Sequence, residues 1–261
     1  MRMNRILIGS FFLWTIPAMA YTPAIEQWYL DWKNPPAAPR AEAKYCQNVK
    51  DLDPGNLDKI QSFCPTQVNP AAAFVKETAA LKNENSQDSC AYQARQLQVL
   101  IDEVGTQGEQ CDTRAALATA AKGSEVSGGD NNGQTQDVGD ASTMQNAQVP
   151  VRTACIEQLK KISAVAQAQK QKLEAQAPKF FNAVDGEEKK IGHGENFPCA
   201  KVKLNLYSGG RVAQKMLTKM ASDADQVLAK ATQAIANHQA KIQAVDSYNK
   251  KIDATKKQLG Q

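Results

Sequence analysis

The chain has 261 residues, of which 42% are hydrophobic, 6% aromatic and 22% charged, and its formal net charge is +4. It contains no phosphate-binding glycine loop, no G-x-S-x-G nucleophile motif and no H-E-x-x-H metal motif. Beyond the first twenty residues, no segment approaches the ~18 consecutive apolar residues of a transmembrane helix. The sequence therefore argues against an enzyme, a cofactor-binding protein and a membrane-spanning protein.

Residues 1–20 have the pattern of a secretory signal peptide. Arg2 and Arg5 form a positively charged start, an apolar run follows over 6–18, and a small-x-small cleavage site ends at Ala20. We therefore expect cleavage after Ala20 and a periplasmic or secreted mature protein.

Residues 21–40 predict an aromatic helix followed by a proline-rich linker. Ile25, Trp28, Tyr29 and Trp32 are spaced i, i+3, i+4 and i+7, which places them on one helix face. This stripe packs either on the protein's own core or on a partner, because aromatic side chains are effective interface anchors. We take Trp28, Tyr29 and Trp32 as candidate interaction residues.

Residues 41–122 predict a disulfide-braced helical region. The chain has six cysteines, an even number, as expected where disulfides persist, and none stands in a C-x-x-C pair. All six are disulfide candidates: Cys46, Cys64, Cys90, Cys111, Cys155 and Cys199. We favour a local bridge between Cys46 and Cys64, because the segment between them is loop-like.

For the other four cysteines, the distances imposed by helices disfavour some pairings but do not select one. A helix between Cys90 and Cys111 would hold these residues roughly 20 Å apart, beyond disulfide reach. The same objection applies to Cys155 with Cys199. The remaining connectivities stay open.

The helices of this region follow an irregular segment over 41–70, which has a turn signal at 53–55. The helices are expected at about 71–81, 88–104 and 110–121. Gly105 and Gly108 would bracket the turn between the last two, and Asp88 or Ser89 is a plausible N-cap for the second.

Residues 123–149 predict a disordered linker, because Gly, Ser, Asn, Asp and Gln offer almost nothing to bury. Part of this segment resembles a calcium-binding loop. The match is poor, since Gly128 and Gly139 occupy the first and last ligand positions.

Residues 150–261 predict a long antiparallel helical hairpin of coiled-coil type, which makes the protein all-α. The longer helix is expected from Ser208 to about Lys257, roughly 70 Å, and its partner over about 151–184. Two heptad series fill its seam. The first is Leu217, Ala224, Ala231, His238, Val245 and Ile252. The second is Ala221, Leu228, Ile235, Ile242 and Asn249. The hairpin closes on itself or pairs between chains.

The two halves of the mature chain differ in charge. Residues 21–149 hold 10 Lys and Arg against 17 Asp and Glu (net −7), and residues 150–261 hold 19 against 10 (net +9). This asymmetry indicates an anionic partner, mutual attraction of the two halves, or lysines that solvate the outer face of the hairpin. Binding to nucleic acid is not favoured, because the basic helices carry few aromatic residues to stack on bases.

The sequence thus predicts a structural or adhesive protein that contacts another envelope or extracellular protein, or associates with itself through the heptad seam. The alternative is a small-ligand or metal-binding bundle with a cavity near His193 or His238. A third hypothesis, an enzyme that uses Cys199 with His193, requires a free thiol. We assign no catalytic or metal-binding residue and no cofactor.

Overall fold

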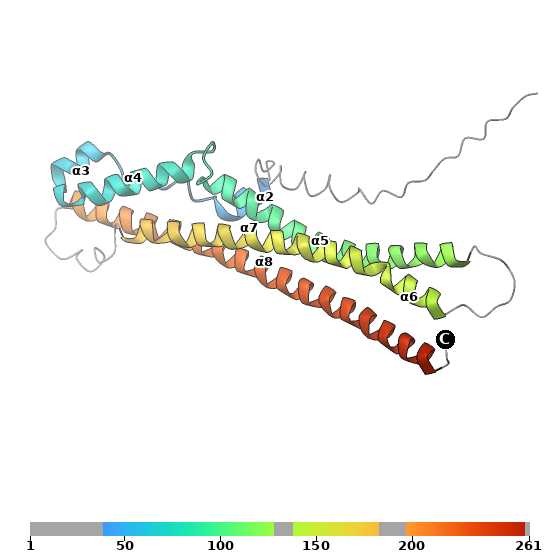
Figure 1. The fold of residues 1–261 in the computed structure, drawn as a ribbon. Coiled ribbons are helices and arrows are strands. Elements are labelled where there is room, and N and C mark those ends of the chain that lie inside the picture. The colour runs from blue at the N-terminus through green and yellow to red at the C-terminus, as the bar shows by residue number, and fades with distance from the viewer. Residues whose placement is uncertain (1–38, 128–137, 183–196, 259–261) are drawn as a thin grey trace, which may run out of the picture. The chain divides into compact units, whose positions relative to one another are not determined.

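The computed structural model describes residues 39–127, 138–182 and 197–258, and every regular element in these ranges is a helix. The all-α prediction is therefore confirmed for the described residues (Figure 1). The predicted signal peptide and the predicted aromatic stripe with Trp28, Tyr29 and Trp32 lie outside them. None of the described helices combines the length and apolar character that a bilayer-spanning segment needs.

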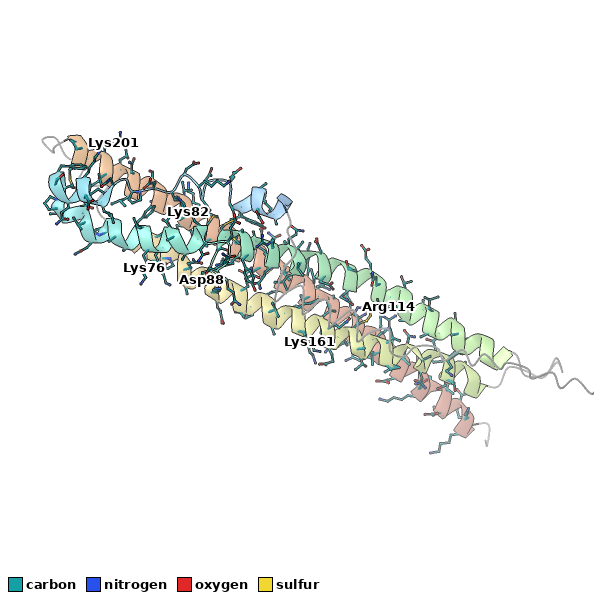
Figure 2. All side chains as sticks on the ribbon, turned by 90° about the horizontal axis from the view of Figure 1, so that it is seen from above. Lys76, Lys82, Asp88, Arg114, Lys161 and Lys201 are labelled. Carbon is teal, nitrogen blue, oxygen red and sulfur yellow. A yellow bond between two sulfur atoms is a disulfide. The ribbon has the colours of Figure 1, made fainter. Side chains whose placement is uncertain are left out.

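Three long helices, α5 (Cys90–Ser127), α7 (Gln148–Asn182) and α8 (Phe197–Gln258), lie side by side (Figure 1). α7 runs antiparallel to α8 and forms the predicted hairpin with it, and α5 packs on both. At about 1.5 Å per residue, the 62 residues of α8 extend over roughly 93 Å. Figure 2 shows the helices from above, with Lys161 on α7 and Lys201 on α8 as landmarks.

The first heptad series of α8 is buried along its whole length within one chain. Its members are Leu217, Ala224, Ala231, His238, Val245 and Ile252, none of them more than 7% exposed. In the second series only Ala221 is buried, and the later members are half-buried. Within this chain the hairpin therefore closes on itself, through the first heptad series of α8.

The start of α8 differs from the prediction, because this helix begins at Phe197 and not at Ser208. Gly209 lies inside it, against the ring of Phe74 on α4 (Val68–Lys82). Phe74 in turn meets Phe180 of α7 edge to face, with the ring centroids 6.0 Å apart. Because glycine has no Cβ, the ring can pack directly on the helix backbone. This packing outweighs the low helix propensity of glycine.

α5 is one helix, and the predicted turn at Gly105 and Gly108 is wrong. Each glycine costs a helix roughly 1 kcal/mol, but this cost is offset by a buried face that runs from Cys90 to Ala115, on both sides of the glycines. That face includes Leu97, Leu100, Val104, Cys111 and Ala115. The predicted cap is confirmed, since the Tyr92 backbone N–H donates to Ser89 Oγ at 3.1 Å.

The segment predicted as a disordered linker contains α6 (Val138–Asn146), while α5 and α7 extend into it from either side. Residues 128–137 lie outside the described residues. Asn249 on α8 accepts from Ser142 Oγ at 2.8 Å and donates to Asn146 Oδ1 at 2.7 Å. α6 therefore covers the C-terminal part of α8, which extends past the start of α7.

The segment before α4 is more regular than predicted. It holds α2 (Pro39–Tyr45), α3 (Leu57–Phe63) and the 3-10 turn η1 (Pro65–Gln67). The predicted turn at 53–55 is present: Gly55 has φ 94° and its N–H donates to Asp53 Oδ1 at 2.9 Å. α2 packs on α5 and α8.

Candidate functional site

A polar cluster of four charged or titratable residues joins the three long helices near the N-terminal end of α7. It consists of Asp112 from α5, Arg152 from α7, and His238 and Lys241 from α8, and we call it the Arg152–His238 cluster. His238 and Arg152 are buried, 2% and 7% exposed. His238 lies in the core because it occupies a heptad position between apolar residues one and two turns away.

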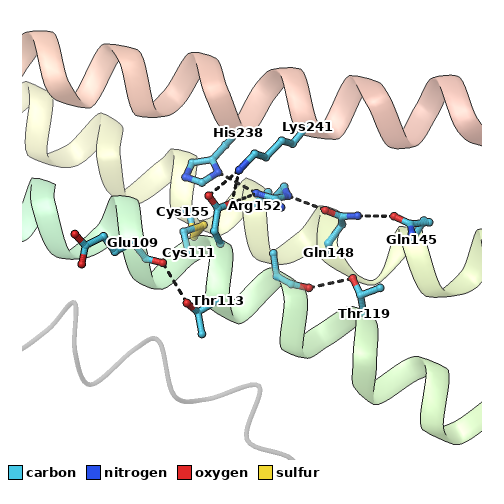
Figure 3. A network of polar contacts seen from close by, with 12 residues as sticks. Glu109, Cys111, Thr113, Thr119, Gln145, Gln148, Arg152, Cys155, His238 and Lys241 are labelled. Atoms are coloured by element: carbon cyan, nitrogen blue, oxygen red, sulfur yellow. Dashed lines mark hydrogen bonds and ion pairs between the residues drawn. A yellow bond between two sulfur atoms is a disulfide. The ribbon is translucent and has the colours of Figure 1, made fainter.

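Arg152 is the centre of the hydrogen bonding in this cluster (Figure 3). Its Nη1 donates to Asp112 Oδ1 at 2.7 Å and lies 3.2 Å from His238 Nδ1, and its Nε donates to Gln148 Oε1 at 2.8 Å. Lys241 Nζ bonds both Asp112 oxygens, at 2.7 and 2.6 Å. One carboxylate therefore serves two cations that come from different helices.

The two titratable members have shifted pKa values. Burial alone would raise the pKa of Asp112, but the hydrogen bonds from Lys241 and Arg152 outweigh burial and hold this pKa below its usual value. Burial lowers the pKa of His238; Asp112 opposes this effect, while Arg152 and Lys241 add to it. At neutral pH the cluster therefore holds an ionised carboxylate and a neutral imidazole.

A cleft of about 320 Å³ lies beside His238, between α5 and α8. Its lining includes Asp112 and Lys241 and three small residues, Gly108, Ala234 and Ala240. The small side chains leave space next to the imidazole, so a small ligand could approach the cluster from solvent.

A second polar group attaches α2 to α8. Asp223 accepts from the Tyr45 hydroxyl and from Lys44 Nζ, the latter at 2.9 Å, and Lys219 Nζ lies 3.7 Å away. Burial, followed by the bond to Asp223, raises the pKa of Tyr45 to about 12. Burial alone would raise the pKa of Asp223, but the bonds from Lys44 and Tyr45 outweigh it and lower this pKa.

Several glutamine side chains of α5 and α7 are buried. They include Gln93, Gln96, Gln107, Gln158, Gln169 and Gln176. Gln93 Nε2 donates to Gln176 Oε1 at 3.1 Å, and Gln169 Nε2 donates to the Gln93 carbonyl at 2.7 Å. Amide hydrogen bonds thus fix these two helices alongside apolar packing, each contributing about 1 kcal/mol.

All six predicted cysteines form disulfides, but the predicted local bridge is wrong. The bonds are Cys46–Cys90, Cys64–Cys199 and Cys111–Cys155. The segment between Cys46 and Cys64 does not close on itself, because α2 packs on α5 and α3 contacts the start of α8. Cys90 and Cys111 are unpaired with each other, as expected, since one helix separates them.

The structure does not bring the remaining candidate residues, Cys199 and His193, together in a site. Cys199 is bonded to Cys64, which removes the free thiol that the enzyme hypothesis requires. His193 lies outside the described residues. Within the described ranges, no three His, Cys, Asp or Glu side chains come together as metal ligands.

Sequence reasoning placed His238 in the core but missed its partners. Asp112 and Arg152 had no distinguishing pattern, because their pairing depends on the register between α5, α7 and α8. A buried polar residue in a heptad seam was the available signal that a partner must exist.

In comparisons with known proteins, no protein family model, no curated protein and no solved structure matches the chain.

Proposed function

We propose that the protein is an exported structural or protein-interaction component of the cell envelope or the extracellular space. The observation that carries this proposal is the bracing of all three long helices by disulfides. α5 is bonded to α7 through Cys111–Cys155, and α8 is bonded through Cys199 to Cys64, the residue that caps the end of α3. Such bridges persist in oxidising compartments, and they stabilise the folded arrangement of the helices.

The first heptad series of the seam is buried within the chain, so a partner would contact other parts of the surface. Large apolar side chains are exposed at separate places: Leu117 on α5 is 64% exposed, Leu204 on α8 is 55% exposed and Tyr248 on α8 is 41% exposed. Scattered exposed apolar residues are common on proteins. These three are the natural positions at which to probe for a partner.

Site-specific photo-crosslinking tests the proposal. A photoreactive residue is placed at Leu117, Leu204 or Tyr248 of the full chain in the cells that make it, with the exposed polar positions Lys161 and Gln171 as matched controls. We expect one protein adduct of defined mass from at least one apolar position and none from the controls. The proposal is wrong if no position gives an adduct and the purified protein is a monomer at every concentration in light scattering.

A small-ligand role is the second candidate, and the cleft beside His238 is the observation that favours it. Thermal unfolding of the oxidised protein with divalent metals and with hydrophobic ligands tests it. A stabilisation that Lys241→Ala removes would support the cleft as the site. If none of these ligands shifts the midpoint, the small-ligand role is contradicted.

A further inference from the structure

We propose that the contact between Arg152 and His238 is an acid-sensitive latch, whose protonation releases the C-terminal part of α8 from α6. The released segments would be 239–258 on α8 and 138–147 around α6. This inference does not depend on the proposed function.

The hydrogen bond between Arg152 and His238 can form only when the His238 imidazole is neutral. An arginine side chain has N–H donors and no acceptor. Arg152 Nη1 lies 3.2 Å from His238 Nδ1, so Nδ1 must accept and the ring proton must be on Nε2. Protonation adds a proton to Nδ1, which turns the contact into two donors and two positive charges facing each other.

The charged groups around His238 cannot compensate for the positive charge that protonation adds. The charged groups that face it are Asp112 from α5, Arg152 from α7 and Lys241 from α8. Asp112 is already bonded to both cations. Protonation would place three positive charges beside one carboxylate, in a core where His238 is 2% exposed.

The neighbouring disulfide decides which helix moves. Cys111 directly precedes Asp112, and Cys155 is one turn from Arg152, so the Cys111–Cys155 bond ties α5 to α7 beside the cluster. Figure 3 shows this bond next to Arg152, with His238 and Lys241 on the third helix. Repulsion therefore separates α8 from the α5–α7 pair.

The part of α8 beyond the cluster is the more weakly held. Past Lys241 its buried apolar side chains are Val245 and Ile252, and Asn249 supplies the hydrogen bonds to α6. Before the cluster, α8 is buried more densely, at Met216, Leu217, Met220, Ala221, Ala224, Val227 and Ala231. We therefore expect only the part of α8 that follows the Arg152–His238 cluster to detach.

The direction of the pH dependence follows from the lowered pKa of His238. In the open form the ring titrates near its ordinary value of 6.5, whereas the closed form binds the proton less readily. Closure is therefore fully favoured above 6.5. As the pH falls below 6.5, the ratio of closed to open molecules should decrease by about tenfold per pH unit until the pKa of the closed form is reached.

Two measurements on the oxidised full chain test the latch. Histidine-labelled protein with His193→Gln gives a single imidazole NMR signal, whose titration between about pH 4 and about pH 8 reports the pKa of His238. Hydrogen exchange over the same range, corrected for intrinsic rates, reports the opening of 239–258 and 138–147. Segments 90–104 and 159–177 are internal controls.

We expect a pKa below 6.5 and a loss of protection confined to the two C-terminal-side segments, about tenfold per pH unit. In His238→Asn the side-chain oxygen can accept from Arg152 without titrating, so this pH dependence should disappear. A pKa at or above 6.5, a loss of protection spread over all segments, or an unchanged pH dependence in His238→Asn would each overturn the proposal. The titration and hydrogen exchange of the protein with native His238 decide the question even if His238→Asn does not fold.

Discussion

The ring of Phe74 packs directly against the backbone of Gly209. A Cβ built on Gly209 would lie 2.7 Å from Phe74 Cζ and 3.3 Å from its Cε2. Phe74 is 1% exposed and is held from its other side by Phe180. The ring therefore has little room to move, and this contact docks α4 onto α8.

Gly209→Ala should destabilise the protein although alanine favours helix. The propensity gain is about 1 kcal/mol, but displacing a packed ring costs more, so we expect a net loss of about 1–3 kcal/mol. Urea unfolding of the oxidised protein measures it. Gly105→Ala is the matched control: it also lies inside a long helix, but nothing lies within 4 Å of its added Cβ. The control should gain about 0.5–1 kcal/mol. Stabilisation by both changes would contradict the packing role.

Removal of the buried Cys111–Cys155 disulfide should destabilise the protein strongly. Its cysteines are 44 residues apart, for which loop closure in the unfolded chain predicts a loss of about 4 kcal/mol in the double Cys→Ala variant. The Cys46–Cys90 pair has the same separation and is the control. The loss should be larger at Cys111 and Cys155, both 0% exposed, because the change also leaves a cavity. A larger loss at Cys46 and Cys90 in urea unfolding would refute this ranking.

The Tyr45 hydroxyl should ionise at a higher pH than an ordinary tyrosine, partly because it is bonded to Asp223. The folded pKa of about 12 lies above the ordinary value of 10.0. The buried neutral hydroxyl therefore stabilises the fold fully below pH 10, and this contribution is lost as the pH rises through about 12. Ultraviolet titration of tyrosinate should show a late step that Tyr45→Phe removes. Asp223→Asn should move this step to lower pH without abolishing the effect of burial; an unmoved step would exclude the carboxylate as a cause.

Arg152→Ala should destabilise the protein by about 1–3 kcal/mol, because it leaves the buried His238 Nδ1 without its donor. Lys160→Ala on the same helix is the control. Lys160 is 56% exposed and pairs with Glu157, which is 59% exposed, and such surface pairs contribute less than about 1 kcal/mol. Equal losses in the two variants, measured by urea unfolding, would show that the Arg152–His238 cluster contributes nothing specific.

The long helices could be predicted from sequence because their apolar residues are periodic over many turns. The heptad series from Leu217 to Ile252 identified the buried face of α8, including His238. The capping residue Ser89 and the turn at Gly55 were equally local, since each depends on bonds to residues two or three positions away. Evidence of this kind lies within a short stretch of chain.

Helix ends and cysteine partners were decided by contacts between distant residues. Gly105 and Gly108 resemble a turn until α5 is packed on its neighbours. The polar segment around α6 is ordered by Asn249, more than a hundred positions away.

The sequence by itself therefore determined the fold class, the antiparallel hairpin and the buried face of α8, because these follow from periodicity within one segment. Only the tertiary structure decided the disulfide pairs and the meeting of Asp112, Arg152 and His238. Those contacts depend on the axial register of three helices, and register is set by the packing of all three at once.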